Sequence, residues 1–507
     1  MTAGTVVETD SSTACKLHYK KIHAAVDLSS ISQVFAGRRS ASILGGNVSI
    51  KDSGGFSYWA AEPKELFEFR SGQKDPFEKL HKALTKYNLE PDAVRNTQYA
   101  GTRLPRGIFC GGWVGYFSYE LGRYIEKLPE SVARPSWPWY HGLEARDTDL
   151  QMPLIRLCFY DRLIAYDHKQ NKFWLFAVEF PDDDEEPQDK FAGLEEILAQ
   201  ARGICISHPK TADFENIDFS QTCLPTGKIR CNMDKEYYLR MVERIKRYIY
   251  DGDVYQINFS QRFECDYNAK AIDLFNWQNH YNPSPYAAYI DGGDFYIVSA
   301  SPEMFITIID GIIETRPIKG TRPHIENDAR ANEENFNELL TSEKEKAELN
   351  MIIDLERNDV ARICIPGTRR VIQPRTIETY PTVFHAVATV AGRLRSEITF
   401  CDILKAMFPG GSITGAPKIR SMEIIDETEP TARGVYTGSI GYIGLDGSVC
   451  LNIAIRTIII KNQKAFAQTG GGIVADSDPQ AEWDETITKA RALLAGINAT
   501  NSVKRLA

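Results

Sequence analysis

The chain has 507 residues, 43% of them hydrophobic and 25% charged, a composition typical of globular proteins with enough apolar material for a large core. Its net charge of −9 argues against nucleic acid as the main partner, because phosphate binding favours a basic surface. The ten cysteines form no CxxC pair and indicate reduced, cytoplasmic thiols, and no apolar run approaches the roughly 18 residues of a membrane span.

Residues 1–228 are predicted to form mixed strands and helices. The first fifteen residues carry acids and no apolar stretch, so we expect a loose N-terminus and not a targeting peptide. Residues 107–123 place glycines among aromatics, as in strands whose backbones approach closely. Residues 157–180 are predicted to form a hairpin around His168–Asn171, and a helix near 189–203 precedes a polar stretch, 206–228, that marks the expected boundary.

Residues 229–507 show a more regular pattern. Asp234 is expected to cap a helix that ends at Asp251 and Gly252. A strand at 255–266, a helix at about 270–280, strands at 285–290, 295–300, 303–309 and 312–318, and a final helix at about 479–496 are predicted to follow. Groups of antiparallel strands between helices imply the α+β class.

Two predicted helices each present a pair of glutamates three residues apart. Glu345 and Glu348 lie at the edge of an apolar stripe, and Glu482 and Glu485 repeat the arrangement in the last helix. A carboxylate that faces a core must be paired, protonated or bound to a cation. Two such pairs offer hard oxygen ligands that suit Mg²⁺, although the same spacing also occurs on solvated helix surfaces.

Two glycine-rich segments could bind an anion through backbone N–H groups. One contains Gly470, Gly471 and Gly472 at the end of a strand, and the other, FPGGSITGAPK (408–418), adds the hydroxyl of Ser412. Neither matches a nucleotide-binding motif, and glycine turns often serve geometry alone.

Arg456 and His385 are polar residues in apolar surroundings. Arg456 lies in an otherwise apolar predicted strand and needs an anion, either from the protein or from a ligand. His385 is flanked by apolar residues, so it is either a hydrogen-bonded core histidine or a contact to a substrate.

Lys319 follows an apolar strand and precedes a Gly-Thr turn, with Arg316 and Arg322 nearby. Burial and neighbouring cations would both lower the pKa of its amine. If the strands at 303–309 and 312–318 form a hairpin, Glu303 lies near the same end. An acid/base candidate would then stand beside a nucleophile candidate.

Residues from about 229 to 497 resemble the chorismate-binding enzymes. The segments that carry the resemblance are DGDVYQINFSQRF, NPSPYAAYI, SPEMF, TRPIKGTRP, IIDLERND, FPGGSITGAPKIRSMEIIDE, GSIGYIG, IAIRT and GGGIVADSDPQAEWDET. The earlier GGWVGYFSYELGR and FYDRLIAYDH are similar to this family's companion region. The resemblance implies an α+β fold with two large orthogonally packed antiparallel β-sheets flanked by helices, a companion region at 1–228, and a Mg²⁺-dependent chorismate site in 229–507.

The resemblance also assigns roles to individual positions. Glu348 and Glu485 match direct metal ligands, with Glu345 and Glu482 in support. The positions that match or adjoin substrate-binding positions are Gly320, Thr321, His385, Ser412, Tyr442, Arg456, Gly470, Gly471, Gly472 and Lys489.

Lys319 separates two branches of the family. Anthranilate synthases usually carry alanine at this position, whereas aminodeoxychorismate synthases carry lysine, which adds to C2 of chorismate and expels the 4-hydroxyl before ammonia attacks C4. Ser412, where anthranilate synthases tend to have threonine, points the same way. The resemblance therefore favours aminodeoxychorismate synthesis, with Glu303 as the acid/base, as a step towards 4-aminobenzoate and folate.

The resemblance also implies partners. No glutaminase motif accompanies Cys110, so we expect a separate glutamine amidotransferase subunit to supply ammonia. Family relatives hold tryptophan in the N-terminal region, which makes tryptophan a candidate ligand. Two alternatives stay open: anthranilate synthase component I, and a non-catalytic regulator that binds chorismate or tryptophan. The intact set of Lys319, Glu303 and four glutamates argues against the regulator.

Overall fold

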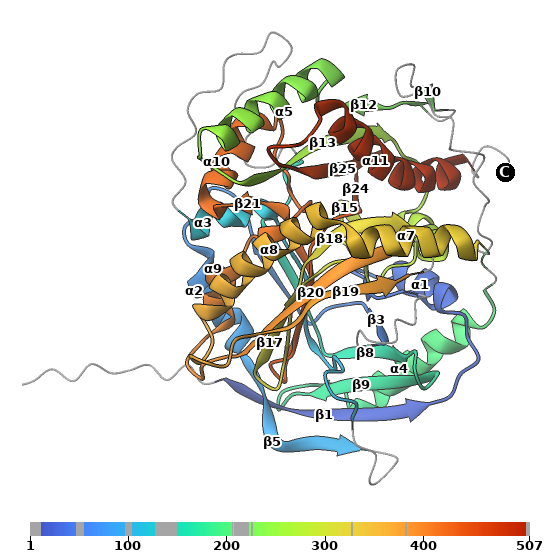
Figure 1. The fold of residues 1–507 in the computed structure, drawn as a ribbon. Helices are drawn as coiled ribbons and strands as arrows, with labels where there is room; N and C mark the ends of the chain where they lie inside the picture. The colour runs from blue at the N-terminus through green and yellow to red at the C-terminus, as the bar shows by residue number, and fades with distance from the viewer. Residues whose placement is uncertain are drawn as a thin grey trace, which may run out of the picture.

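The computed structural model describes residues 12–46, 55–96, 104–126, 150–204, 206, 223–224, 227–325, 328–380 and 383–502. Residues 1–11 of the expected loose N-terminus and most of the expected boundary at 206–228 lie outside these ranges. Two large, mostly antiparallel sheets packed together, with helices outside them, confirm the α+β class (Figure 1). Within the described ranges, no helix combines the length and apolar character needed to span a membrane.

The larger sheet runs through the whole height of the view in Figure 1. Its strands, in spatial order, are β12 (Arg230–Cys231), β13 (Gln256–Asp266), β25 (Lys464–Ile473), β24 (Thr457–Lys461), β15 (Phe295–Ser301), β14 (Tyr286–Asp291), β2 (Ser42–Leu44), β3 (Phe56–Ala60), β8 (Arg162–Asp167), β9 (Lys172–Glu179), β1 (Thr13–Ile22) and β5 (Tyr87–Asn96). A further short strand, β21 (Gly415–Ala416), pairs with β13.

The smaller sheet begins at β18, which lies at its edge. The spatial order is β18 (Ile318–Pro323), β20 (Val383–Arg393), β17 (Ile312–Arg316), β16 (Met304–Ile309), β23 (Val449–Asn452), β22 (Ser439–Gly444), β6 (Gly112–Phe117), β7 (Ile155–Tyr160) and β4 (Glu65–Phe69), with β19 (Arg370–Thr379) also paired to β20. A separate hairpin joins β10 (Cys223–Leu224) and β11 (Gly227–Lys228).

The helices lie on the outer faces of the sheets. They are α1 (Leu28–Ala36), α2 (Pro76–Thr85), α3 (Gly122–Ile125), α4 (Pro187–Ala201), α5 (Lys235–Tyr250), α6 (Ala271–Tyr281), α7 (Ala329–Thr341), α8 (Glu343–Ala361), α9 (Phe400–Met407), α10 (Lys418–Thr428) and α11 (Pro479–Ser502), with short 3₁₀ turns η1 (Tyr119–Leu121) and η2 (Gly411–Ile413). Asp234 caps α5 and Ser342 caps α8 through their side-chain oxygens. Such caps satisfy N–H groups that the first helical turn leaves unpaired.

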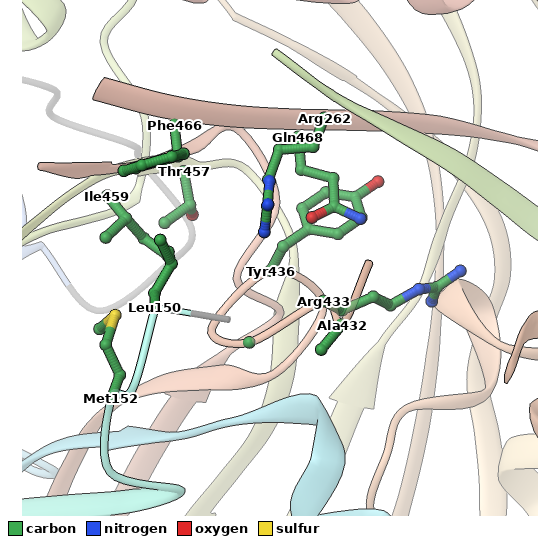
Figure 2. Close-up of a pocket in the computed structure, with 11 residues that line it drawn as sticks. Leu150, Met152, Arg262, Ala432, Arg433, Tyr436, Thr457, Ile459, Phe466 and Gln468 are labelled. Carbon is green, nitrogen blue, oxygen red and sulfur yellow. The ribbon is translucent and has the colours of Figure 1, made fainter. Parts of the chain in front are cut away.

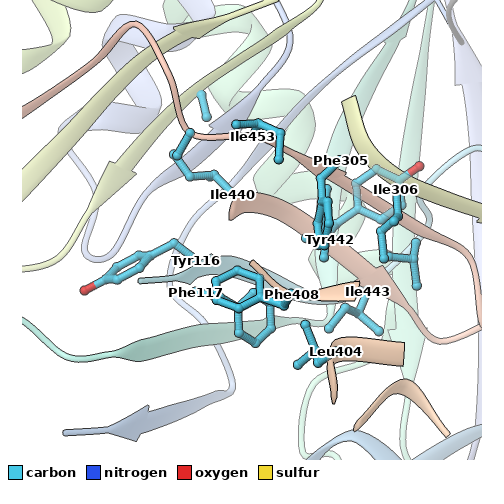
Figure 3. Close-up of a cluster of buried hydrophobic side chains, with 14 of the residues drawn as sticks. Tyr116, Phe117, Phe305, Ile306, Leu404, Phe408, Ile440, Tyr442, Ile443 and Ile453 are labelled. Carbon is cyan, nitrogen blue, oxygen red and sulfur yellow. The ribbon is translucent and has the colours of Figure 1, made fainter. Parts of the chain in front are cut away.

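The main hydrophobic core lies between the two sheets. Figure 3 shows part of it, where Phe305 of β16, Tyr442 of β22 and Phe117 of β6 come together. A second cluster fills the outer face of the larger sheet beneath α1, α4, α6 and α11. In β6, a Cβ on Gly115 would lie 1.9 Å from the carbonyl oxygen of Arg156, so this strand approaches β7 as closely as its glycine pattern predicts.

Strands from both sides of the expected boundary share both sheets. In the larger sheet β14 pairs with β2, and in the smaller sheet β22 pairs with β6. The division into a companion region and a catalytic region therefore stays a prediction about function, because the two stretches of sequence build one pair of sheets.

Candidate active site

Lys319 lies at a β-bulge in the edge strand β18. We expected strand 312–318 to deliver it, but β17 ends at Arg316, and Lys319 is the second residue of a new strand after Pro317. The register between β18 and β20 shifts between Ile318 and Thr321, and Gly320 has a φ of +93°. Since a bulge re-aims its side chains and favours glycine at positive φ, this segment can turn the Lys319 amine towards the larger sheet.

The amine of Lys319 lies close to β25 of the larger sheet and to η2. Its Nζ donates to the carbonyl oxygen of Ser412 at 3.3 Å and lies 3.5 Å from the position that a Cβ on Gly472 would take. Burial lowers the pKa of Lys319, and the nearby charge of Lys489 adds to this effect, while Glu348 and Glu303 oppose it.

The arginines next to Lys319 in the sequence do not act as we expected. Arg316 is paired with Glu378, and Arg322 is paired with Glu338 and Glu345 at 2.8 and 2.7 Å. Their charges are compensated by these carboxylates. Burial, with Lys489 from α11, therefore accounts for the low pKa of the lysine.

Glu303 is buried at the start of the hairpin that β16 and β17 form, as the sequence predicts. Its Oε1 accepts a hydrogen bond from Ser412 Oγ at 2.6 Å. Burial raises the pKa of Glu303, whereas the Ser412 hydrogen bond and the charge of Lys319 lower it less strongly. Glu303, Ser412 and Lys319 therefore form one connected group.

The two glutamate pairs approach this group from α8 and α11. Glu345 Oε1 accepts from Arg322, while its Oε2 is buried and has no hydrogen-bond partner among the described residues. Glu482 accepts from Ser477 at 2.7 Å, and Glu485 pairs with Lys489 at 2.6 Å.

Electrostatic effects confirm that these carboxylates share one neighbourhood. Burial raises the pKa of Glu348 and of Glu482, and in both cases the negative charge of Glu485 adds to this effect. Burial also acts on Glu485, but Lys489 and Lys319 hold the pKa of that carboxyl below its usual value. Both α8 and α11 therefore face Lys319.

The donor chemistry of the four glutamates fits Mg²⁺. They offer hard oxygen ligands, and the orphaned Oε2 of Glu345 is an acceptor that a cation would satisfy. In the part of the chain that the structure describes, however, no three His, Cys, Asp or Glu side chains lie together as a group that could hold a metal ion. Arg322, Lys489 and Ser477 instead hold three of the four carboxylates.

Gly470, Gly471 and Gly472 form the wall of the site within β25, where they pair with β13. Gly470 O accepts from Lys489 Nζ at 2.9 Å, and a Cβ on Gly471 would lie 3.0 Å from Glu482 Oε2. Among the described strands, the pairing of β25 with β24 ends at Ala467, so these glycines are paired along the β13 edge only. They thus lie near the end of a strand, as the sequence predicts.

Arg456 lies in the link between β23 and β24, and not inside a strand as we predicted. Its φ of +49° is incompatible with a regular strand. Its guanidinium makes no hydrogen bond or ion pair with any described residue, and burial lowers its pKa. A cation in this state is suited to an anionic ligand.

His385, in β20, lies beside Thr321 and is influenced by Arg456. Its Nδ1 and Thr321 Oγ1 are 2.9 Å apart, and its Nε2 is buried without a partner in the described structure. Burial, helped by the positive charge of Arg456, lowers the pKa of His385 to about 3, so the ring is neutral. Both interpretations of His385, as a hydrogen-bonded core residue and as a contact to a substrate, are compatible with these contacts. The ring is buried and bonded through Nδ1, and Nε2 is left for a ligand.

Tyr442 is the one expected substrate contact that the described structure does not bring to the cluster. Its ring packs against Tyr58 and Phe109 in the core between the sheets, and its hydroxyl donates to Gly107 O at 3.3 Å. A role in substrate binding stays a prediction that none of these contacts supports.

Sequence reasoning missed Gln256 at the start of β13. This side chain is 1% exposed, its Oε1 has no partner in the described structure, and its Nε2 lies 2.4 Å from the Cβ position of Gly472. The signal was present as a polar residue at an inward position of the alternating stretch YQINFSQRF. A single glutamine in a strand is too common to stand out by itself.

Figure 2 shows a small cavity further along β13 and β25, lined by Arg262 and Gln468 with apolar neighbours such as Met152 and Phe466. It has room for about 20 Å³, roughly the space of one water molecule. It is therefore too small for a substrate the size of chorismate, and the convergence of side chains on Lys319 marks the candidate site instead.

The chain is similar to several known proteins. A family model described as chorismate binding enzyme matches residues 49–495. The anthranilate synthase component 1 of Pseudomonas putida is 40% identical over 403 residues, which cover 78% of this chain and 76% of the relative. The aminodeoxychorismate synthase component 1 of Klebsiella aerogenes is 36% identical over 423 residues, which cover 83% and 82%. The crystal structure of anthranilate synthase component I from Streptococcus pneumoniae TIGR4 has a TM-score of 0.68 and 30% identity, covering 88% of this chain and 93% of that one.

Proposed function

The chain belongs to the chorismate-binding enzymes, and from that premise we propose that it is aminodeoxychorismate synthase component I. It converts chorismate and ammonia to 4-amino-4-deoxychorismate, a precursor of 4-aminobenzoate and folate. The observation that carries this proposal is Lys319, an amine with a lowered pKa that lies beside Glu303 and Ser412. Only a neutral amine can act as a nucleophile, so a lysine of low pKa is suited to covalent catalysis.

The side chains divide the reaction between them. The neutral Lys319 amine attacks C2 of chorismate, both ring double bonds shift by one position, and the bond from C4 to its hydroxyl breaks. Glu303, whose pKa is raised, donates the proton with which that hydroxyl leaves as water. Ammonia then attacks C4, both double bonds return to their original positions, and Lys319 leaves C2 as the free amine. The enolpyruvyl group is retained.

Substrate binding is assigned to the cationic and polar groups around this centre. Chorismate is a dicarboxylate, and two groups supply positive charge for it: the guanidinium of Arg456, which has no partner among the described residues, and the amine of Lys489. Thr321, His385 and the glycines of β25 complete the proposed contacts. Mg²⁺ held by Glu348 and Glu485, with Glu345 and Glu482 in support, would neutralise a carboxylate of the substrate.

Anthranilate synthase component I is the second candidate, because the relative from Pseudomonas putida that carries this name is 40% identical. The two reactions differ in the carbon that ammonia attacks. Lys319 and Ser412 support the aminodeoxychorismate route. A non-catalytic regulator is less well supported, since a regulator needs neither Lys319 nor its link to Glu303.

The proposal also includes partners and a location. A separate glutamine amidotransferase supplies the ammonia, which the words "component 1" in the relatives' names support. Tryptophan is proposed as a ligand of residues 1–228, to be tested by calorimetric titration of protein freed of endogenous ligand. A cytoplasmic location is proposed from the scattered cysteines, which indicate reduced thiols.

A turnover assay separates these functions. Purified chain is incubated with chorismate, Mg²⁺ and ammonium, and the product is identified by chromatography and mass spectrometry. We expect 4-amino-4-deoxychorismate with ammonium and no product with glutamine alone. Anthranilate as the main product would favour the second candidate, and no product under any of these conditions would favour the regulator.

A further inference from the structure

Helix α8 buries a second pair of carboxylates two turns beyond Glu348. Glu356 and Asp359 are each 3% exposed, and neither belongs to the proposed metal or substrate contacts. Asp359 Oδ2 accepts from Lys418 Nζ at 2.6 Å, and the same amine donates to Met407 O at 2.9 Å. Glu356 Oε1 accepts from the backbone N–H of Gly411 at 3.3 Å.

These contacts fasten both ends of the segment 408–418 to α8. Gly411 lies at one end and Lys418 at the other, and each is held by one carboxylate of the pair. The fit at Gly411 is tight, since a Cβ there would lie 2.4 Å from Leu355 Cδ2 and 3.2 Å from Glu356 Oε1. The segment therefore cannot move relative to α8 without breaking these contacts.

The same segment carries Ser412, the residue that joins Glu303 to Lys319. Ser412 Oγ donates to Glu303, and Ser412 O accepts from Lys319. Gly411, which donates to Glu356, is thus the backbone neighbour of Ser412, and Ser412 contacts both proposed reacting side chains. The path runs from Glu356 through Gly411 and Ser412 to Glu303.

The charged groups that face Glu356 come from three elements. Burial raises the pKa of Glu356 to about 7, and the charges of Asp359 on α8 and of Glu303 before β16 add to this effect, while Lys418 of α10 lowers it. Burial also raises the pKa of Asp359. The negative charge of Glu126 adds to this effect, while the positive charges of Lys418 and Arg362 oppose it. Near neutral pH, Glu356 can therefore change its charge inside the protein.

We propose that Glu356 is a positioning residue for the reaction of Lys319 and Glu303: its carboxylate holds the backbone N–H of Gly411, and through Gly411 it holds Ser412 against both side chains. The inference rests on the proposed function in taking these two side chains as the reacting groups. When Glu356 loses its proton, a second negative charge faces Glu303, so Glu303 holds its own proton more tightly and donates it less readily. Activity then falls as the pH rises through the ionisation of Glu356.

The test compares Glu356→Gln, Glu356→Leu and the control Asp161→Asn. Gln keeps an oxygen for Gly411 N–H and mimics the protonated acid, whereas Leu removes the acceptor. Asp161 is also a buried, paired carboxylate, 5% exposed and bound to Lys190, but it belongs to the turn between β7 and β8. We expect kcat of Glu356→Gln at pH 6 to be within about threefold of wild type, and kcat of Glu356→Leu to fall about tenfold or more with an unchanged KM for chorismate.

Two readouts distinguish positioning from simple stabilisation. In the kcat–pH profile, the fall through about pH 7 should be present in wild type and in Asp161→Asn, and absent in Glu356→Gln. In infrared difference spectra between pH 6 and pH 8, the C=O band of a protonated carboxyl should titrate in wild type. In Glu356→Gln that band should be lost, and the Glu303 band, identified with Glu303→Gln, should titrate at lower pH.

The infrared measurement does not depend on turnover. It therefore still tests the interaction between Glu356 and Glu303 if the proposed function is wrong. Unchanged titration of Glu303 in Glu356→Gln would overturn the inference. The inference would also be overturned if both Glu356 variants had the same kcat–pH profile as Asp161→Asn and differed from it only in melting temperature. Glu356 would then be a structural residue alone.

Discussion

The pKa of Lys319 is lowered mainly because its amine is buried, and among the described residues the cation that adds to this effect, Lys489, comes from α11, far away in the sequence. A local sequence pattern shows Arg316 and Arg322 but cannot show that both are paired with carboxylates. The sequence analysis therefore attributed the low pKa of Lys319 correctly to burial. It was wrong about the neighbouring cation, which is Lys489 and not Arg316 or Arg322.

The lysine can be tested by substitution. Lys319→Ala removes the nucleophile while the binding groups stay, so kcat should fall by about three orders of magnitude, roughly 4 kcal/mol of transition-state stabilisation, with KM changed little. Lys319→Arg should not restore activity, because a guanidinium stays protonated. In wild type, kcat should rise with pH through the lowered pKa of Lys319, since the neutral fraction of the amine grows. Full activity of Lys319→Ala with the same product would contradict a covalent role.

Arg456 offers a second test at this scale, because its charge lacks a partner among the described residues. Arg456→Gln removes a cation whose desolvation is uncompensated, so stability should rise by about 1 kcal/mol while KM for chorismate rises at least about tenfold. Thermal melts and calorimetric titration with chorismate measure the two effects. A loss of stability together with unchanged affinity would mean that Arg456 serves the fold and not the ligand.

At the scale of elements, local signals predicted helices and hairpins well. Asp234 caps the helix that its sequence context indicates, and the turn His168–Asn171 joins β8 and β9. The failures concern backbone geometry that depends on distant partners. The positive φ of Arg456 and the bulge at Lys319 both arise from how strands meet across a sheet, which no local pattern specifies.

The glycine strand of the site can be tested at Gly472. A Cβ there would clash with Gln256 Nε2 at 2.4 Å and would contact Lys319 Nζ at 3.5 Å, so Gly472→Ala should displace Gln256 and fill the space beside the amine. We expect it to lower kcat by about tenfold or more without unfolding the protein. Gly193→Ala in α4 is the matched control, because its Cβ would meet no atom within 4 Å. It should leave kcat unchanged and add up to about 1 kcal/mol of stability. Equal kinetics of the two variants would remove Gly472 from the site.

At the scale of the whole molecule, the resemblance predicted the α+β class and the two large sheets, because the family motifs lie in a fixed order. It could not show that each sheet mixes strands from both sides of residue 228. Nor did it place Tyr442, whose ring is buried against Tyr58 and Phe109, two residues from the N-terminal region. Such contacts depend on the assembled tertiary structure.

This mixing makes a prediction about truncation. Residues 229–507 expressed alone would lose β2 as the partner of β14 and β6 as the partner of β22, and would expose the core between the sheets. We expect no cooperative thermal transition by circular dichroism and no heat on titration with chorismate, in contrast to the full chain. A cooperative transition with chorismate binding would show that the second region folds and binds substrate independently.

The central claim is that Lys319 forms a covalent bond to chorismate, and mass spectrometry of the quenched protein and its peptides tests it most directly. Wild-type protein is quenched with acid after brief incubation with chorismate and Mg²⁺ in the absence of ammonia, then digested and mapped. We predict a mass increase equal to chorismate minus water on the peptide that contains Lys319, and no increase in Lys319→Ala. An unmodified peptide in wild-type protein that goes on to make 4-amino-4-deoxychorismate when ammonium is added would contradict the account.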